Sequence, residues 1–393
     1  MNRTRLLALI ASLLVAATSG CSTAKFYSQA IHGQAEILRK ARPTAVVLRD
    51  PTVSGEVRRK LALTQDVRRF AQEQLGLPAD GQYDRYTDLG RRYVSWVVQA
   101  APEFSVEGKT WWYPLLGPLE YRGFFSKSAA DEEAAKLRAK GYEVYVGGVE
   151  AYSTLGWFRD PVLNTFFHST DAELAELLFH ELTHVRLFLP GDTDFNEAFA
   201  TANAEHGVRR WLESKGDRPA LARYEASLAK DREIIRLLLQ TREKLQRLYL
   251  TKSRSVAQMR RGKAAILQQM REDYTQIRAR WRGDSRYDRT FAKPWNNARL
   301  NTVATYYDLV PGFERLLEAK RGNLKKFYAA VEAMRTMTKT ERRAALGGDW
   351  VRTEPMVGLG TDGSRICIRA KGASSYQPGA SPQEPRTAKT RQR

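Results

Sequence analysis

Cysteine is scarce in this chain of 393 residues, which contains only Cys21 and Cys367. Two cysteines form at most one bond, so a disulfide framework is excluded. If Cys21 carries a lipid, Cys367 stands alone and no disulfide can form within the chain. If a leader is instead removed upstream of Cys21 without lipidation, the two cysteines can pair.

The N-terminal apolar run, Leu6 to Ala17, is too short to cross a bilayer as a helix, which needs about 20 residues. Arg3 and Arg5 precede it as a positively charged start. This order of charge and apolar residues is typical of a secretory signal, so we exclude residues 1–20 from the fold.

Small residues lead directly into Cys21 and resemble the lipobox of bacterial lipoproteins. The resemblance implies that Cys21 is lipidated and becomes the mature N-terminus. Ser22, in place of an aspartate, implies retention at the outer membrane, on the side that faces the periplasm. We therefore predict a protein of the bacterial cell envelope that is held by an N-terminal lipid.

Acidic residues are in the minority: 44 Asp and Glu stand against 64 Lys and Arg, a formal net charge of +20. Such a surface favours anionic partners, namely nucleic acid, acidic lipid headgroups or lipopolysaccharide. A simple solvated basic face is the alternative that we favour. No basic run is combined with an RNA-binding aromatic strand or a Cys/His finger, so we expect no specific nucleic-acid binding.

The pattern of the remaining residues predicts an α+β fold that is mostly helical, with a small sheet beside the central helix described below. Helices are expected over Asp84–Ala101 and Ser128–Lys140, and strands over Thr110–Phe125, Glu143–Val149 and Ala151–Phe158. The predicted regions are 1–20 (signal), 21–101 (N-terminal helical region packed on the core), 102–215 (core with the central helix), 216–290 (helical hairpin), 291–370 (C-terminal helical part) and 371–393 (disordered basic tail).

The segment from Arg218 to Trp281 is long, charged and helical, with a break near Thr251 to Arg254. Two antiparallel helices in an extended hairpin are therefore expected. A solvated helical insertion is the simpler interpretation, and an arm that gates substrate access is the alternative.

Histidine is also rare, with five in the chain, yet two of them occur in His180-Glu181-Leu182-Thr183-His184. Thr170 and Glu173 form a capping box ahead of this motif, which predicts that it lies on a helix. Four residues turn a helix by about 400°, so both imidazoles project from one face, roughly 6 Å apart along the axis. Two imidazoles so placed can bind Zn²⁺, and Glu181 beside them can take a proton from water.

A catalytic zinc normally has three protein ligands and one open position. The segment Asp194-Phe195-Asn196-Glu197 looks like the start of a second helix, with Asp194 as its N-cap. A short connection lets the two helices lie antiparallel, so Glu197 is our candidate for the third ligand. A capping carboxylate without metal is the alternative for Glu197, and Glu205 and His206 are later candidates.

HELTH followed by Asn196-Glu197-Ala198-Phe199-Ala200 resembles the gluzincin-type zinc peptidases. More closely, the chain resembles a bacterial family of predicted zinc aminopeptidases, many of them lipoproteins. The matching segments are residues 121–125 (YRGFF), 151–158 (AYSTLGWF), HELTH, 196–200 (NEAFA), and 296–298 (NNA) through Tyr306 to Val310-Pro311. They extend from about Gln29 to Leu316.

The resemblance implies a zincin-like core and two further elements of the site. The extended segment before the metal helix would bind the peptide backbone of the substrate through Ser153, Thr154, Leu155 and Gly156, although a buried strand is equally expected there. Tyr306 would assist the zinc in stabilising the oxyanion, although a tyrosine of the core is the alternative.

These inferences predict a zinc-dependent peptidase, in the first place an aminopeptidase, in which Glu181 activates water. An envelope endopeptidase is the enzymatic alternative. A lipoprotein that only binds, without catalysis, is the non-enzymatic one.

Overall fold

The computed structural model describes residues 25–113, 117–151, 153–154, 158–251 and 253–347. The predicted signal, the lipidation residue Cys21 and the predicted disordered tail lie outside these residues. Within the described part, no helix combines the length and the apolar character that crossing a membrane requires.

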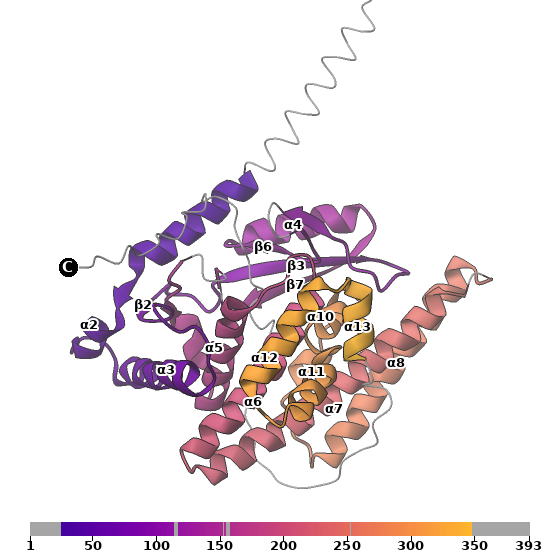
Figure 1. Cartoon of the computed structure of the whole chain (residues 1–393). Helices are drawn as coiled ribbons and strands as arrows, with labels where there is room; N and C mark the ends of the chain where they lie inside the picture. The colour runs from indigo at the N-terminus through magenta and orange to yellow at the C-terminus, as the bar shows by residue number, and fades with distance from the viewer. Residues whose placement is uncertain (1–24, 114–116, 152, 155–157, 252, 348–393) are drawn as a thin grey trace, which may run out of the picture.

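The described chain is mostly helical and contains three small sheets (Figure 1). The helices are residues 25–40, α2 (Thr44–Arg49), α3 (Gly55–Gln74), α4 (Lys127–Ala139), α5 (Asp171–Arg186), α6 (Thr193–Ser214), α7 (Arg218–Tyr249), α8 (Val256–Arg280), α9 (Asp288–Phe291), α10 (Asn297–Tyr307), α11 (Val310–Ala319), α12 (Leu324–Ala333) and α13 (Lys339–Leu346). The strands are β1 (Arg42–Pro43), β2 (Arg85–Thr87), β3 (Ser95–Pro102), β4 (Trp111–Tyr113), β5 (Gly117–Leu119), β6 (Arg122–Phe124), β7 (Tyr142–Val149) and β8 (Val162–Leu163). The predicted α+β, mostly helical character is confirmed at this level.

The antiparallel sheet β6-β3-β7 separates two layers of helices. Because side chains alternate along a strand, Val98 and Ala100 of β3 face α4, where they pack with Leu137. Val97, on the other side of β3, belongs to the main core. Helix α10 contacts both β3 and β7 and links the sheet to α6 and α7.

The predicted helix over Asp84–Ala101 is wrong, because this segment forms β2 and β3. Residues 97–101 of β3 are all buried, since α4 and α10 contact the same strand. A strand that is buried on both faces reads as a continuous apolar run without alternation, and such a run resembles a buried helix in the sequence.

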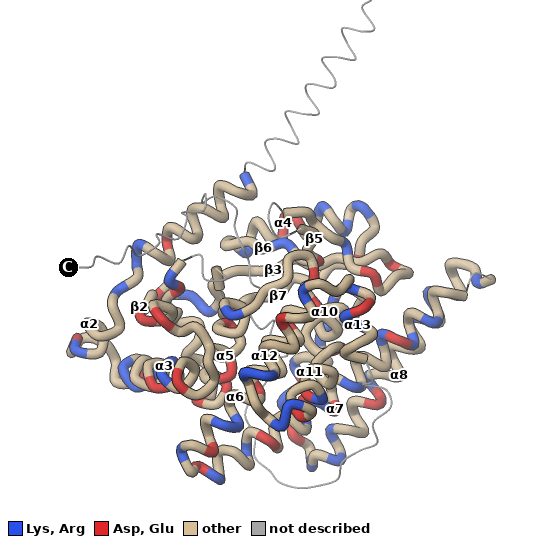
Figure 2. The backbone as a smooth tube through the Cα atoms, in the orientation of Figure 1, with Lys and Arg blue, Asp and Glu red and all other residues tan. Residues whose placement is uncertain are grey.

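Other elements agree with the sequence prediction. Strands β4, β5 and β6 lie within the expected extended segment, α4 spans Lys127–Ala139, and β7 follows as Tyr142–Val149. The helical hairpin is confirmed as α7 and α8, and a capping box of Ser255 and Gln258 begins the second helix. Figure 2 shows basic and acidic residues interspersed along α3 and α7.

Helices α5 and α6 pack closely in the centre of the molecule. Gly207 of α6 permits this contact, because a Cβ atom there would lie 2.8 Å from Phe179 of α5 and 2.8 Å from Leu75. Phe179 immediately precedes the first histidine of the HELTH motif. The small residue therefore fixes how near α6 comes to the motif.

Candidate metal centre

Helix α5 carries the HELTH motif in the buried interior. It begins with the predicted capping box, in which the Thr170 hydroxyl accepts from the Glu173 N–H and the Glu173 carboxylate accepts from the Thr170 N–H. His180, Glu181 and His184 are all fully buried. Sequence alone therefore placed these side chains on the correct element.

Helix α6 supplies Glu197 from its first turns. Its N-cap is Asp192, whose side chain accepts from the Phe195 N–H, so the predicted cap at Asp194 is wrong. Asp194 instead pairs with Arg343, at 3.1 Å. The amide of Asn196 bonds both the N–H and the C=O of Leu189, which holds the connection between the two helices in place.

The two imidazoles and the Glu197 carboxylate meet at one point. His180 Nε2 lies 3.1 Å from Glu197 Oε2 and 3.1 Å from His184 Nε2, and His184 Nε2 lies 3.5 Å from Glu197 Oε2. Tetrahedral ligands at about 2.0–2.1 Å from a zinc ion are separated from one another by about 3.3 Å. The three atoms are thus spaced as ligands of a single divalent ion would be, and among the described residues they form the one such group.

The electrostatics distinguish the two carboxylates of the site. Burial alone would raise the pKa of Glu197, but His184 and His180 outweigh it and hold this pKa below its usual value. Burial, together with the charges of Glu197 and Asp160, raises the pKa of Glu181 well above its usual value. Neither carboxyl oxygen of Glu181 has a hydrogen-bond partner in the described part of the chain. Glu197 is suited to remain ionised as a ligand, and Glu181 to exchange a proton.

Tyr306, from α10, lies beside His180, the first histidine of the motif. Its ring is stacked on that of His180, with centroids 6.2 Å apart. Burial raises the pKa of Tyr306 well above its usual value, and the nearby charges of Glu197 and Glu181 add to this. The phenol therefore stays protonated and can act as a hydrogen-bond donor next to the site.

The predicted substrate strand over Ala151–Phe158 is wrong for the residues that the structure describes there, none of which lies in a strand. Ser153 and Thr154 are buried, and both the N–H and the hydroxyl of Thr154 donate to the Asp160 carboxylate, at 2.7 and 2.9 Å. Local bonding to a carboxylate competes here with strand pairing. Leu155 and Gly156 lie outside the described residues, and the substrate-binding role of the four residues stays a prediction.

Sequence reasoning missed two residues near Glu181. Tyr83 is fully buried with φ at +56°, a strained conformation for a residue with a side chain, and its N–H donates to the Asp160 C=O. The charge of Glu181 helps burial to raise the pKa of the Tyr83 phenol. The sequence gives no signal for either residue. Tyr83 lies in no periodic pattern, and Asp160 was interpreted only as part of the Arg159-Asp160-Pro161 turn.

Replacing Asp160 by asparagine is expected to remove a pH dependence of stability. Burial raises the pKa of Asp160 to about 7, against 3.8 for an ordinary aspartate. The folded protein therefore binds more protons than the unfolded chain between these values, and wild-type stability should fall as pH rises from 4 to 7. Above pH 7 the Asp160→Asn variant should be more stable than wild type, by up to about 4 kcal/mol.

Urea unfolding at pH 5 and pH 8 measures this effect, with the exposed Asp80→Asn as the matched control. At pH 5 the stability advantage of the variant should be less than half of its value at pH 8, because the loss of wild-type stability begins near pH 4. A wild-type stability that stays constant between the two pH values would contradict the assignment.

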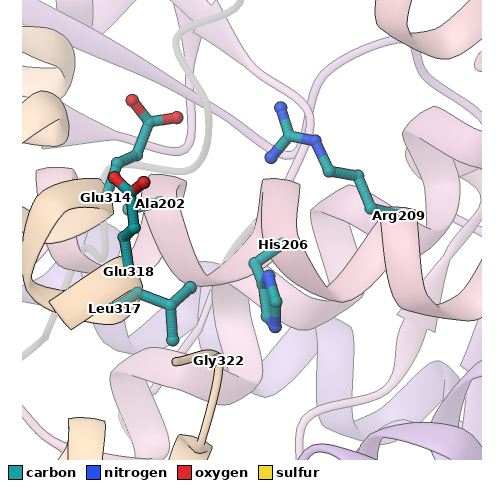
Figure 3. A pocket seen from close by; sticks show the side chains of 7 residues that line it. All are labelled: Ala202, His206, Arg209, Glu314, Leu317, Glu318 and Gly322. Carbon is teal, nitrogen blue, oxygen red and sulfur yellow. The ribbon is translucent and has the colours of Figure 1, made fainter. Parts of the chain in front are cut away.

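The later ligand candidates lie elsewhere on α6. Glu205 accepts from Arg232, at 3.0 Å. His206 lines a surface pocket of about 230 Å³ between α6 and α11 (Figure 3). Nine residues separate it from Glu197, which places it on the opposite side of the helix. Burial and two arginines lower the pKa of His206 to about 4, so the imidazole is neutral.

Comparison with known proteins gives a match to a protein family. No curated protein and no solved structure is similar enough to match. Residues 25–346 match the family described as "Putative aminopeptidase". The matched residues include α5, α6 and α10, and therefore the whole candidate metal centre. This match extends over most of the chain, and the protein belongs to that family.

Proposed function

We propose that the protein is a zinc metallopeptidase in which His180, His184 and Glu197 hold the ion. The observation that carries the proposal is the buried group of two imidazole nitrogens and one carboxylate oxygen, 3.1 to 3.5 Å apart. Three nitrogen and oxygen ligands are typical of a catalytic zinc, whereas structural sites have four protein ligands. The zincin-like arrangement of the core is part of the same proposal.

When bound, zinc would polarise the peptide carbonyl and make water a stronger nucleophile near neutral pH. Glu181, adjacent to the first histidine and without another hydrogen bond in the described chain, would accept the proton of the attacking water. It would then return the proton to the leaving amine. Tyr306, kept protonated by burial, would donate a hydrogen bond to the developing oxyanion.

The finer proposal is an aminopeptidase, which the description of the family supports. The leader sequence and Cys21 support a location at the outer membrane, facing the periplasm, with an N-terminal lipid as anchor. Neither proposal depends on the other.

A panel of aminoacyl-amides and N-blocked peptides tests the activity. We expect cleavage of substrates with a free α-amine, loss of activity on treatment with a chelator, and recovery when Zn²⁺ is returned. Preference for the blocked peptides would overturn the aminopeptidase proposal in favour of an endopeptidase. Chelator-resistant cleavage would overturn the zinc mechanism.

A further inference from the structure

The end of the α7–α8 hairpin contains many basic residues and no acidic ones. No Asp or Glu occurs between Glu243 and Glu272, a stretch that holds eight Lys and Arg: Lys244, Arg247, Lys252, Arg254, Arg260, Arg261, Lys263 and Arg271. The helical charge elsewhere mixes both signs, as α3 and the first half of α7 show in Figure 2. This segment is therefore a local excess of positive charge and not merely a sample of the average surface.

Some of these basic side chains form ion pairs with residues outside the hairpin. Arg260 pairs with Glu103 at 2.7 Å, and Lys263 pairs with Glu143. Three others, Lys244, Arg254 and Arg261, are exposed and have no ion-pair partner among the described residues. Their charge is available to a partner.

Apolar side chains are exposed at the same place. Leu250, at the end of α7, is 72% exposed, and Val256, at the start of α8, is 56% exposed. Tyr249 of α7 contacts Phe104, and Arg260 of α8 contacts Glu103, both just after strand β3. The α7–α8 connection comes between these two contacts in the chain, so it lies at the end of the hairpin beyond them. Figure 1 shows this end of the hairpin projecting at the edge of the molecule.

We propose that the tip of the hairpin, defined by Lys244, Leu250, Arg254, Val256 and Arg261, docks on an anionic lipid bilayer. Basic side chains are attracted to acidic headgroups, and apolar side chains gain by insertion into the boundary between headgroups and acyl chains. All five residues lie within about two helical turns of the connection, which places them at the same end of the hairpin. A nucleic acid would use the cations but would leave Leu250 and Val256 exposed to water.

The test uses the mature chain from residue 22 onward, so that neither the apolar leader nor a lipid on Cys21 holds the protein. Binding to vesicles that contain phosphatidylglycerol is compared with binding to phosphatidylcholine vesicles. One variant combines Lys244→Gln, Arg254→Gln and Arg261→Gln, and a second combines Leu250→Ser and Val256→Ser. The matched control removes three exposed charges from the α11–α12 region, through Arg321→Gln, Lys325→Gln and Lys326→Gln.

We expect the basic variant to partition about 100-fold less well into the anionic vesicles, from about fivefold for each of the three charges removed. The Leu250→Ser, Val256→Ser variant should lose about tenfold or more, and the control should bind like the parent. Equal losses in the control and in the basic variant would overturn the proposal. So would binding that ignores the apolar change, which would indicate a soluble polyanion as the partner. Thermal unfolding confirms that each variant is folded.

Discussion

Replacing Glu181 by glutamine is expected to reduce kcat by about 10²–10⁴-fold while the protein keeps its metal. Glutamine has the shape of glutamate but cannot accept the proton of the attacking water. Glu181 is not one of the three side chains whose ligand atoms converge, so zinc content should be unchanged. Steady-state kinetics and elemental analysis of the same preparation measure both parts of the prediction.

Glu176→Gln is the matched control for this variant. Glu176 lies on the same helix and is also buried, but it accepts a hydrogen bond from the Tyr224 hydroxyl, which a glutamine can still accept. Its activity should resemble that of wild type. A Glu181→Gln protein that keeps a tenth or more of the wild-type kcat would show that another group is the base.

Replacing His180 by alanine is expected to lower the zinc content from one ion per chain to none. His180 Nε2 lies 3.1 Å from each of the other two ligand atoms, so its removal leaves only one imidazole and one carboxylate. Two ligands do not complete the three-residue set of a catalytic zinc, and activity should fall with metal content. Saturating Zn²⁺ should raise the melting temperature of wild type, because it binds only the folded state, but not that of the variant.

His206→Ala provides the control, since it removes a histidine of α6 that lies at the surface pocket and not in the centre. It should retain one zinc per chain and full stabilisation by zinc. If His206→Ala loses the metal to the same extent as His180→Ala, the ion is bound elsewhere.

The parts of the site that the sequence could predict are those encoded within a few residues. The capping box of Thr170 and Glu173 and the four-residue spacing of His180 and His184 depend only on local helix geometry. The structure brings these histidines together with Glu197, as expected, and their role as ligands stays a prediction. The predicted N-cap of α6, Asp194, lies two residues after the actual N-cap, Asp192. The sequence could not distinguish them, because both are aspartates and equally suitable as N-caps.

The parts that could not be predicted depend on contacts between distant segments. The sequence of β3 was interpreted as a helix, because α4 and α10 bury both faces of the strand and its pattern therefore does not alternate. Tyr83 and Asp160 adjoin Glu181 only through tertiary packing, and the positive φ of Tyr83 has no local signal. The segment around Thr154 has the composition of a strand, but the N–H and the hydroxyl of Thr154 donate to the Asp160 carboxylate.

Anomalous diffraction at the zinc edge, from crystals of the zinc-loaded protein, locates the bound ion. We expect a single strong peak in the interior, about 2.0–2.2 Å from His180 Nε2, His184 Nε2 and an oxygen of Glu197, with a fourth position left to solvent. A peak bound by other residues, a fourth protein ligand at this site, or no peak between these three side chains would contradict it.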